Sequence, residues 1–175
     1  MKERMPPLSI WPRGLGTMVL VTMAATGCDD PDLPPPPPAE VVADYYKTPA
    51  GLEVTLDGRT VEIEVTQSDR QLRRGGTLWA KVGPYVFLFT EESQALLQDH
   101  AGVQGIRVTT RNSAGRMVAT ALLRRGALTE VQWQRALNIA GRARKDGTAQ
   151  MTLLEDLVDW GEEHTEFEYD TRFHH

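Results

Sequence analysis

The sequence predicts an α+β fold: a mostly antiparallel sheet of about six to seven strands with a C-terminal helical pair packed on one face. Two observations lead to this prediction. Short alternating or apolar runs, separated by turn residues, fill most of 52–123, which is typical of strands. Two segments with helix-capping residues and helical spacing follow over 129–163. Strands grouped before helices favour α+β over a regular alternation of the two.

The strongest single signal is a hairpin at the start of this region. Residues 52–56 and 59–65 alternate apolar and polar side chains, and the Asp-Gly dipeptide at 57–58 suits a type I′ turn. A two-residue turn at 57–58 would place Glu53 opposite Glu62. Two facing carboxylates repel each other, so this polar face needs full solvation or a cation such as Lys81 or an arginine between the strands.

The next segment is predicted as a loop followed by two strands. Residues 66–76 are polar and basic, which indicates a loop. Residues 77–82 and 85–89 lie on either side of Gly83-Pro84 and are rich in aromatic and branched side chains. The second run is apolar at every position, as in a strand covered on both faces, and is expected at the centre of the sheet.

A short helix and a second hairpin complete the strand-rich region. Thr90 can cap a helix over 91–100. Residues 105–111 and 116–123 predict a hairpin whose turn is 112–115, because Asn, Ser and Gly favour turns.

The C-terminal third predicts two helices and an edge strand. A capping box at 129–132 opens a helix to about Lys145, which Gly147 ends. A second capping box at 152–155 opens a helix over about 153–163. Residues 165–169 alternate polar and apolar side chains, as in an edge strand.

Composition limits the classes of function. The chain has 175 residues, a formal charge of −5 and one cysteine. One cysteine excludes a disulfide framework and any zinc site built on several thiolates. The excess of acidic residues argues against a nucleic-acid partner. No phosphate-binding loop, nucleophile elbow or zinc-binding helix motif occurs, and no cofactor is predicted.

Charge is unevenly distributed along the chain. Residues 59–126 hold ten Lys and Arg against six Asp and Glu, a net charge of +4. Residues 146–175 hold one Arg against nine Asp and Glu, a net charge of −8. Either the two regions lie side by side and partly neutralise each other, or the acidic surface faces a basic partner or metal ions.

The amino end has the pattern of an export signal. Lys2, Arg4 and Arg13 precede an apolar run over 15–25, which is too short to span a bilayer. The stretch Ala-Thr-Gly-Cys at 25–28 resembles the lipobox of bacterial lipoprotein precursors, although Ala25 occupies a position that is usually a branched residue. The alternative is a plain signal peptide with an incidental cysteine nearby.

The resemblance implies cleavage between Gly27 and Cys28 and the transfer of a diacylglycerol to the Cys28 sulfur. Two or three acyl chains hold a protein durably on a membrane. The expected location is therefore the cell envelope, outside the cytoplasm, with the choice between inner and outer membrane left open. The acylated Cys28 would make the membrane itself a partner.

Three segments follow from these observations: a signal peptide over 1–27, an acidic and proline-rich tether over 28–43, and one α+β domain over 44–175. The five prolines at 34–38 favour an extended polyproline II spacer. At about 3.1 Å per residue the tether would reach on the order of 50 Å. The alternative is a ligand for a proline-recognition domain.

Two groups of residues are candidates for a binding site. His164, Glu166 and Glu168 would align on one face if a strand covers them, and could then hold a divalent cation; the alternative is an ordinary half-buried edge strand. Arg70, Arg73 and Arg74 could hold a phosphate or a cell-wall carboxylate; the alternative is a solvated loop.

Asp99 and His100 are the one candidate pair for acid–base catalysis, because a carboxylate can orient an imidazole. A histidine at the carboxyl end of a helix is also simply favourable to the helix dipole. The function predicted from the sequence is a lipid-anchored envelope protein whose domain binds or scaffolds an envelope protein or cell-wall partner, without catalysis. The alternative is a membrane-anchored periplasmic hydrolase or metal-binding protein.

Overall fold

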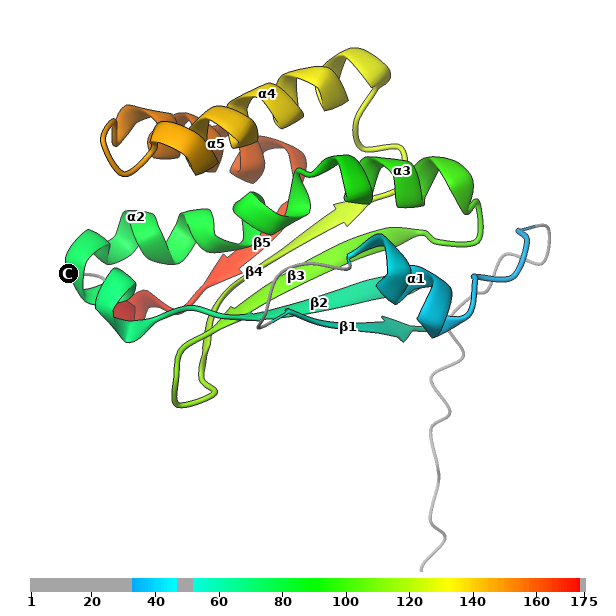
Figure 1. Ribbon diagram of the computed structural model, residues 1–175, viewed down its shortest axis with the longest axis horizontal. Coiled ribbons are helices and arrows are strands. Elements are labelled where there is room, and N and C mark those ends of the chain that lie inside the picture. The colour runs from blue at the N-terminus through cyan, green and yellow to red at the C-terminus, as the bar shows by residue number, and fades with distance from the viewer. Residues whose placement is uncertain (1–32, 47–51, 174–175) are drawn as a thin grey trace, which may run out of the picture. The chain divides into compact units, whose positions relative to one another are not determined.

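Two hairpins and one final strand form the sheet in the computed structural model, which describes residues 33–46 and 52–173 (Figure 1). The strands are β1 (Leu52–Asp57), β2 (Thr60–Thr66), β3 (Gly105–Arg111), β4 (Met117–Arg124) and β5 (Glu166–Tyr169). They lie in the order β1-β2-β3-β4-β5, and every neighbouring pair is antiparallel except β2 and β3, which are parallel. The α+β prediction is confirmed; over the described ranges the sheet has five strands, so the prediction of six to seven is wrong.

The helices are α1 (Ala39–Tyr45), α2 (Asp69–Leu88), α3 (Glu91–Asp99), α4 (Glu130–Asp146) and α5 (Thr152–His164), with a short 3-10 turn η1 (Thr171–Phe173). Figure 1 shows α2 to α5 on one face of the sheet. The C-terminal pair α4 and α5 packs mainly on α2, and α2 itself packs on β3 and β4. The predicted pair therefore exists, but α2 separates most of it from the sheet.

Helix α2 is the main departure from the sequence prediction. The loop predicted over 66–76 and the strands predicted over 77–82 and 85–89 are wrong, because most of these residues form α2. The part of α2 after Gly76 is covered by the sheet below and by α5 above, and its side chains are apolar except those of Thr77 and Lys81. A short apolar run of this kind cannot be distinguished from a buried strand by its periodicity.

A glycine and a proline lie at unusual positions inside α2. Gly76 has φ 55° and ψ −143°, so the backbone bends there and divides α2 into two helical parts. Only glycine adopts this conformation without strain. Pro84 lies in the second part and has no N–H to donate to the preceding turn. Burial of the surrounding side chains, including Tyr85 and Leu88, offsets that loss.

The first hairpin is confirmed, but its register differs from the prediction. Asp57 pairs with Thr60, so the turn residues are Gly58 and Arg59, and Gly58 has φ 57°. Glu53 consequently lies opposite Glu64 rather than Glu62. A shift of two residues keeps every side chain on its predicted face, because the side-chain period of a strand is two.

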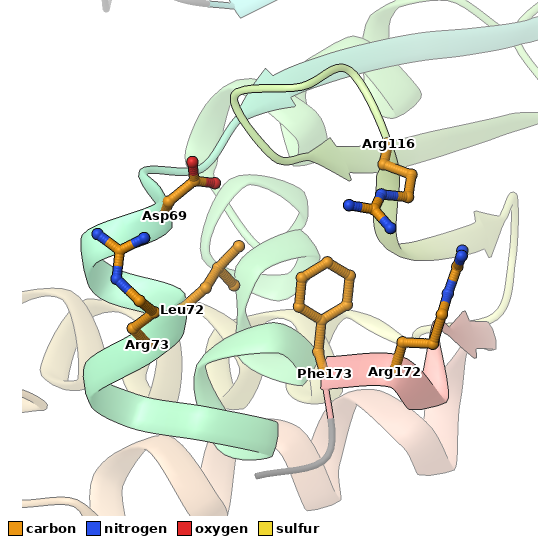
Figure 2. Close-up of a pocket in the computed structure, with 6 residues that line it drawn as sticks. All are labelled: Asp69, Leu72, Arg73, Arg116, Arg172 and Phe173. Atoms are coloured by element: carbon orange, nitrogen blue, oxygen red, sulfur yellow. The ribbon is translucent and has the colours of Figure 1, made fainter.

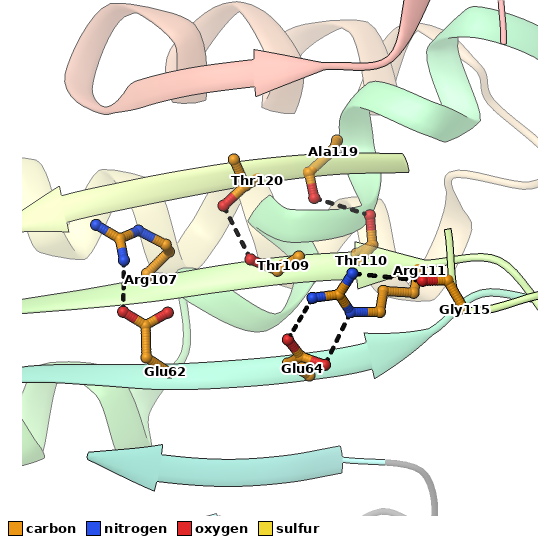
Figure 3. Close-up of polar contacts among 9 residues, drawn as sticks. All are labelled: Glu62, Glu64, Arg107, Thr109, Thr110, Arg111, Gly115, Ala119 and Thr120. Carbon is orange, nitrogen blue, oxygen red and sulfur yellow. Dashed lines mark hydrogen bonds and ion pairs between the residues drawn. The ribbon is translucent and has the colours of Figure 1, made fainter. Parts of the chain in front are cut away.

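The face of the sheet away from α2 carries charged and hydroxyl side chains (Figure 3). Arg107 of β3 donates to Glu62 at 2.6 Å, and Arg111 donates to both oxygens of Glu64 at 2.7 and 2.8 Å. The cations that neutralise the β2 carboxylates are therefore arginines of β3. Lys81 instead pairs with Glu162 of α5 at 2.7 Å, which joins the basic middle of the chain to its acidic end.

The other predicted caps and turns have mixed outcomes. Thr90 accepts from the Ser93 N–H and begins α3, and Thr129 forms the predicted capping box with Gln132 at the start of α4. The second predicted capping box is wrong: Met151 occupies the N-cap of α5, no side chain caps the helix, and Thr152 is its first residue. The β3–β4 hairpin and the edge strand β5 are confirmed.

Candidate functional site

A pocket of about 330 Å³ lies at the end of the sheet where β2 and β3 finish and β4 begins (Figure 2). We call it the arginine pocket. It is lined by the first turn of α2, the residue before β4 and the turn η1, through Asp69, Leu72, Arg73, Arg116, Arg172 and Phe173. Three segments that are distant in the sequence therefore contribute a guanidinium each.

The floor of the arginine pocket is apolar. Leu72 and Phe173 pack with Ala80 and Val118, both fully buried, in a small cluster separate from the main core. Figure 2 shows the Phe173 ring and the Leu72 side chain directed into the space between the arginines. A ligand in this space would meet hydrocarbon below and positive charge at the rim.

The three guanidiniums are in different electrostatic states. Arg172 donates to both oxygens of Asp170 at 2.6 to 2.9 Å, and these hydrogen bonds hold the pKa of Asp170 below its usual range. Within residues 33–46 and 52–173, the guanidiniums of Arg73 and Arg116 form no hydrogen bond or ion pair. Figure 2 shows the Arg116 guanidinium over the open space and that of Arg73 beside Asp69, so both keep donors that an anion could use.

The turn between β3 and β4 fixes the position of Arg116. The side-chain oxygen of Asn112 accepts from the Ala114 and Arg116 N–H groups at 3.1 and 2.9 Å, and Gly115 adopts φ 75°. An asparagine that bonds to the backbone two residues on, followed by a glycine, is a stable turn. The predicted turn at 112–115 therefore has a second role, because it presents Arg116 to the pocket.

Asp69 is the carboxylate at the rim. The Ser113 hydroxyl and backbone N–H both donate to it. These bonds, and more weakly the nearby charges of Arg73 and Arg116, lower the pKa of Asp69 below its usual value. Asp69 is therefore ionised at neutral pH and already bonded, so it links α2 to the β3–β4 turn.

The predicted anion-binding residues are partly in this site. Arg70, Arg73 and Arg74 all lie in the first part of α2, and Arg73 lines the arginine pocket. Arg116 and Arg172 were missed, because nothing in the sequence alone shows that the β3–β4 turn and the end of β5 meet at α2. It is the antiparallel register of β4 against β5 in the structure that brings residues after 169 next to residues before 119.

The structure does not bring the predicted metal ligands together. Glu166 and Glu168 share one face of β5, but His164 ends α5 and stacks on Trp160 with the ring centroids 3.9 Å apart. Glu166 is paired with Arg124 of β4. Across the described residues, no group of three His, Cys, Asp or Glu side chains is suitably placed to hold a metal ion.

The pair Asp99 and His100 contacts the end of α1. The Tyr45 hydroxyl donates to Asp99 at 2.7 Å and lies 3.2 Å from Nε2 of His100. The bond to Asp99 raises the pKa of Tyr45. The two residues therefore attach the end of α1 to the end of α3.

The proline run packs against the domain at the opposite end of the sheet from the arginine pocket. Arg59 donates to the carbonyl oxygens of Pro34 at 2.6 Å and Gly102 at 3.3 Å. A Cβ atom at Gly102 would lie 2.3 Å from the Pro35 carbonyl oxygen, so only glycine admits this approach. We call residues 33–38 with Arg59 and Gly102 the proline clamp.

Part of the predicted tether 28–43 is therefore folded onto the domain. Pro38 has φ −56° and ψ 149°, which is polyproline II geometry, and its carbonyl accepts from two N–H groups of α1. Val42 of α1 is fully buried in the core. The predicted signal peptide over 1–27 and the predicted lipidation site Cys28 lie outside the described residues, as do His174 and His175.

No helix within the described ranges has the length and apolar character that crossing a membrane requires. Comparison of the chain with protein-family models, curated proteins and solved structures gave no match.

Proposed function

We propose that this chain is a bacterial envelope lipoprotein, anchored through an acylated Cys28, whose domain binds an anionic partner without catalysis. The observation that carries the binding role is the pair of unpaired guanidiniums, Arg73 and Arg116, above an apolar floor. Guanidiniums bind anions but do not give up protons at physiological pH. Asp69 has a lowered pKa and is held by Ser113, so it is a poor proton carrier at neutral pH.

The proline clamp supports a particular orientation. Five residue steps separate Cys28 from Leu33, and an extended chain of that length spans at most about 18 Å. An anchored Cys28 would therefore keep the clamp end of the domain near the bilayer. The seven-residue strands β2 and β3, each about 23 Å long, place the arginine pocket at the far end. In this arrangement the pocket faces away from the membrane that holds the protein.

The anchoring is tested by labelling growing cells with an alkyne-bearing fatty acid. The wild-type chain should incorporate the label and require detergent for extraction, whereas Cys28→Ser should incorporate none. Gly141→Ala is the matched control, because a Cβ at Gly141 meets no atom within 4 Å and the fold is kept. A wild-type protein without label, or a processed Cys28→Ser protein that still sediments with membranes, would contradict the proposal.

A further inference from the structure

We infer that the arginine pocket binds one carboxylate group joined to a small apolar group. This inference rests on the proposed binding function and names the ligand class of the same pocket. It follows from three features of the site: its net charge, the chemistry of its unpaired donors, and the size and character of its floor.

The net charge of the site fits a single negative charge. Arg172 is neutralised by Asp170, which lies beside the pocket and bonds to it through both oxygens. The remaining charges at the rim are Arg73, Arg116 and Asp69. One uncompensated positive charge is left, which matches a carboxylate better than a dianionic phosphate.

The donors of the site also suit a carboxylate. A guanidinium presents two parallel N–H groups that match the two oxygens of a carboxylate. Figure 2 shows the Arg116 guanidinium extending over the open space above Phe173, while Arg73 lies on the opposite side near Asp69. A bound carboxylate would thus complete the hydrogen bonds of Arg116 and lie within the field of Arg73.

The floor selects the rest of the ligand. Leu72 and Phe173 offer hydrocarbon surface, and burying such surface against an apolar group favours binding. A volume of about 330 Å³ is at the lower end of the range for ligand pockets, so the apolar group is small. A short fatty acid and the C-terminal residue of an apolar peptide both present this chemistry.

The test is an NMR titration of the ¹⁵N-labelled full chain with hexanoate and N-acetyl-leucine, which represent the two sources. Hexanamide, which lacks the charge, and inorganic phosphate are the comparison probes. We expect a carboxylate Kd of about 1 mM, reasonable for a ligand of this size. The amide signals of residues 113–116 should move, and hexanamide should leave them in place.

Substitutions identify the groups that bind. Arg116→Gln and Arg73→Gln should each weaken hexanoate binding about tenfold, because a charge-assisted hydrogen bond or a nearby charge is lost. Arg142→Gln makes the same charge change on an exposed residue of α4 and should leave the affinity within about twofold of wild type. Phe173→Ala should weaken hexanoate more than acetate, because only hexanoate uses the apolar floor.

Different results of these titrations would overturn or support the inference. Equal binding of hexanamide and hexanoate, tighter binding of phosphate, or an equal loss in Arg142→Gln and Arg116→Gln would overturn the inference, and so would the absence of any carboxylate binding. A preference for hexanoate or for N-acetyl-leucine would support it and identify the source. The fatty-acid labelling of Cys28 is an independent measurement, so failed anchoring and failed carboxylate binding are told apart.

Discussion

Two pairs of arginines, one pair at each end of the sheet, use their guanidiniums in opposite ways. At the clamp end, Arg59 donates to carbonyl oxygens of Pro34 and Gly102, and Arg125 donates to those of His100 and Val103. Their donors are consumed by the chain's own backbone. At the pocket end, Arg73 and Arg116 have open space and no such partner in the described part of the chain.

This difference separates structural from functional arginines. A guanidinium that bonds to backbone carbonyls stabilises the fold, and its removal leaves those carbonyls without a donor. A guanidinium beside an open pocket contributes little to stability and keeps its donors for a ligand. The same residue type should therefore give opposite experimental results at the two ends.

The largest expected effect is that of Gly102→Ala at the clamp. The added Cβ would meet the backbone of Pro35, which cannot rotate away, so we expect the free energy of unfolding to fall by about 2 kcal/mol. Chemical denaturation measures this. Gly141→Ala lies in the interior of α4 with open space around it and should raise stability by up to about 1 kcal/mol. Equal stability of the two variants would mean that the proline run does not pack as described.

A smaller loss is expected for Arg59→Gln. The shorter side chain cannot reach both the Pro34 and the Gly102 carbonyl oxygens, so about 1 kcal/mol of stability should be lost. Urea denaturation measures this loss. If the slope of the unfolding free energy against urea concentration is the same as in wild type, the variant has lost only native contacts. A variant as stable as wild type would remove the structural role assigned to this arginine.

Arg116→Gln should change stability by no more than about 0.5 kcal/mol, because its guanidinium bonds to no other described residue. The same urea measurement, run beside Arg59→Gln, compares the two ends of the sheet directly. A loss as large as that of Arg59→Gln would show that Arg116 supports the fold, and the contrast between the ends would fail.

The smallest effect concerns acid stability at the pocket end. The folded-state pKa of Asp69 lies below the usual 3.8, chiefly because of the Ser113 hydroxyl. The resulting stabilisation is present above the unfolded-state pKa and is lost as the pH falls through the folded-state value. Ser113→Ala should raise the pKa of Asp69 toward its usual value, which an NMR titration of the carboxyl carbon measures. An unchanged pKa would assign the shift to Arg73 and Arg116 instead.

The two hairpins, α3, α4 and β5 could be predicted from sequence because each depends on local signals. Asp-Gly at 57–58, Thr90, and the capping box at 129–132 act on residues close to them in the chain. Helix α2 could not be predicted in this way. Its apolar run fits either a central strand or a buried helix, and Gly83-Pro84 suggested a turn.

The candidate site, like the fold, could be predicted from the sequence only in part. The basic run 70–74 indicated an anion site, and Arg73 does line the arginine pocket. The predicted metal group did not form, because His164 ends a helix while Glu166 and Glu168 lie on a strand that follows it. Whether side chains from neighbouring elements share a face depends on where the helix stops, and His164 falls on the helix side of that boundary.

The sequence by itself determined the α+β class, most turns and caps, and the signal that predicts export and anchoring, since all of these depend on neighbouring residues. Only the tertiary structure decided that α2 is a helix, that the proline run rests on Gly102, and that Arg73, Arg116 and Arg172 meet. The physical reason is the same in each case. The burial of a helix, the close packing of two backbones and the grouping of charged side chains all depend on segments that are far apart in the chain. No local sequence pattern shows which segments will meet.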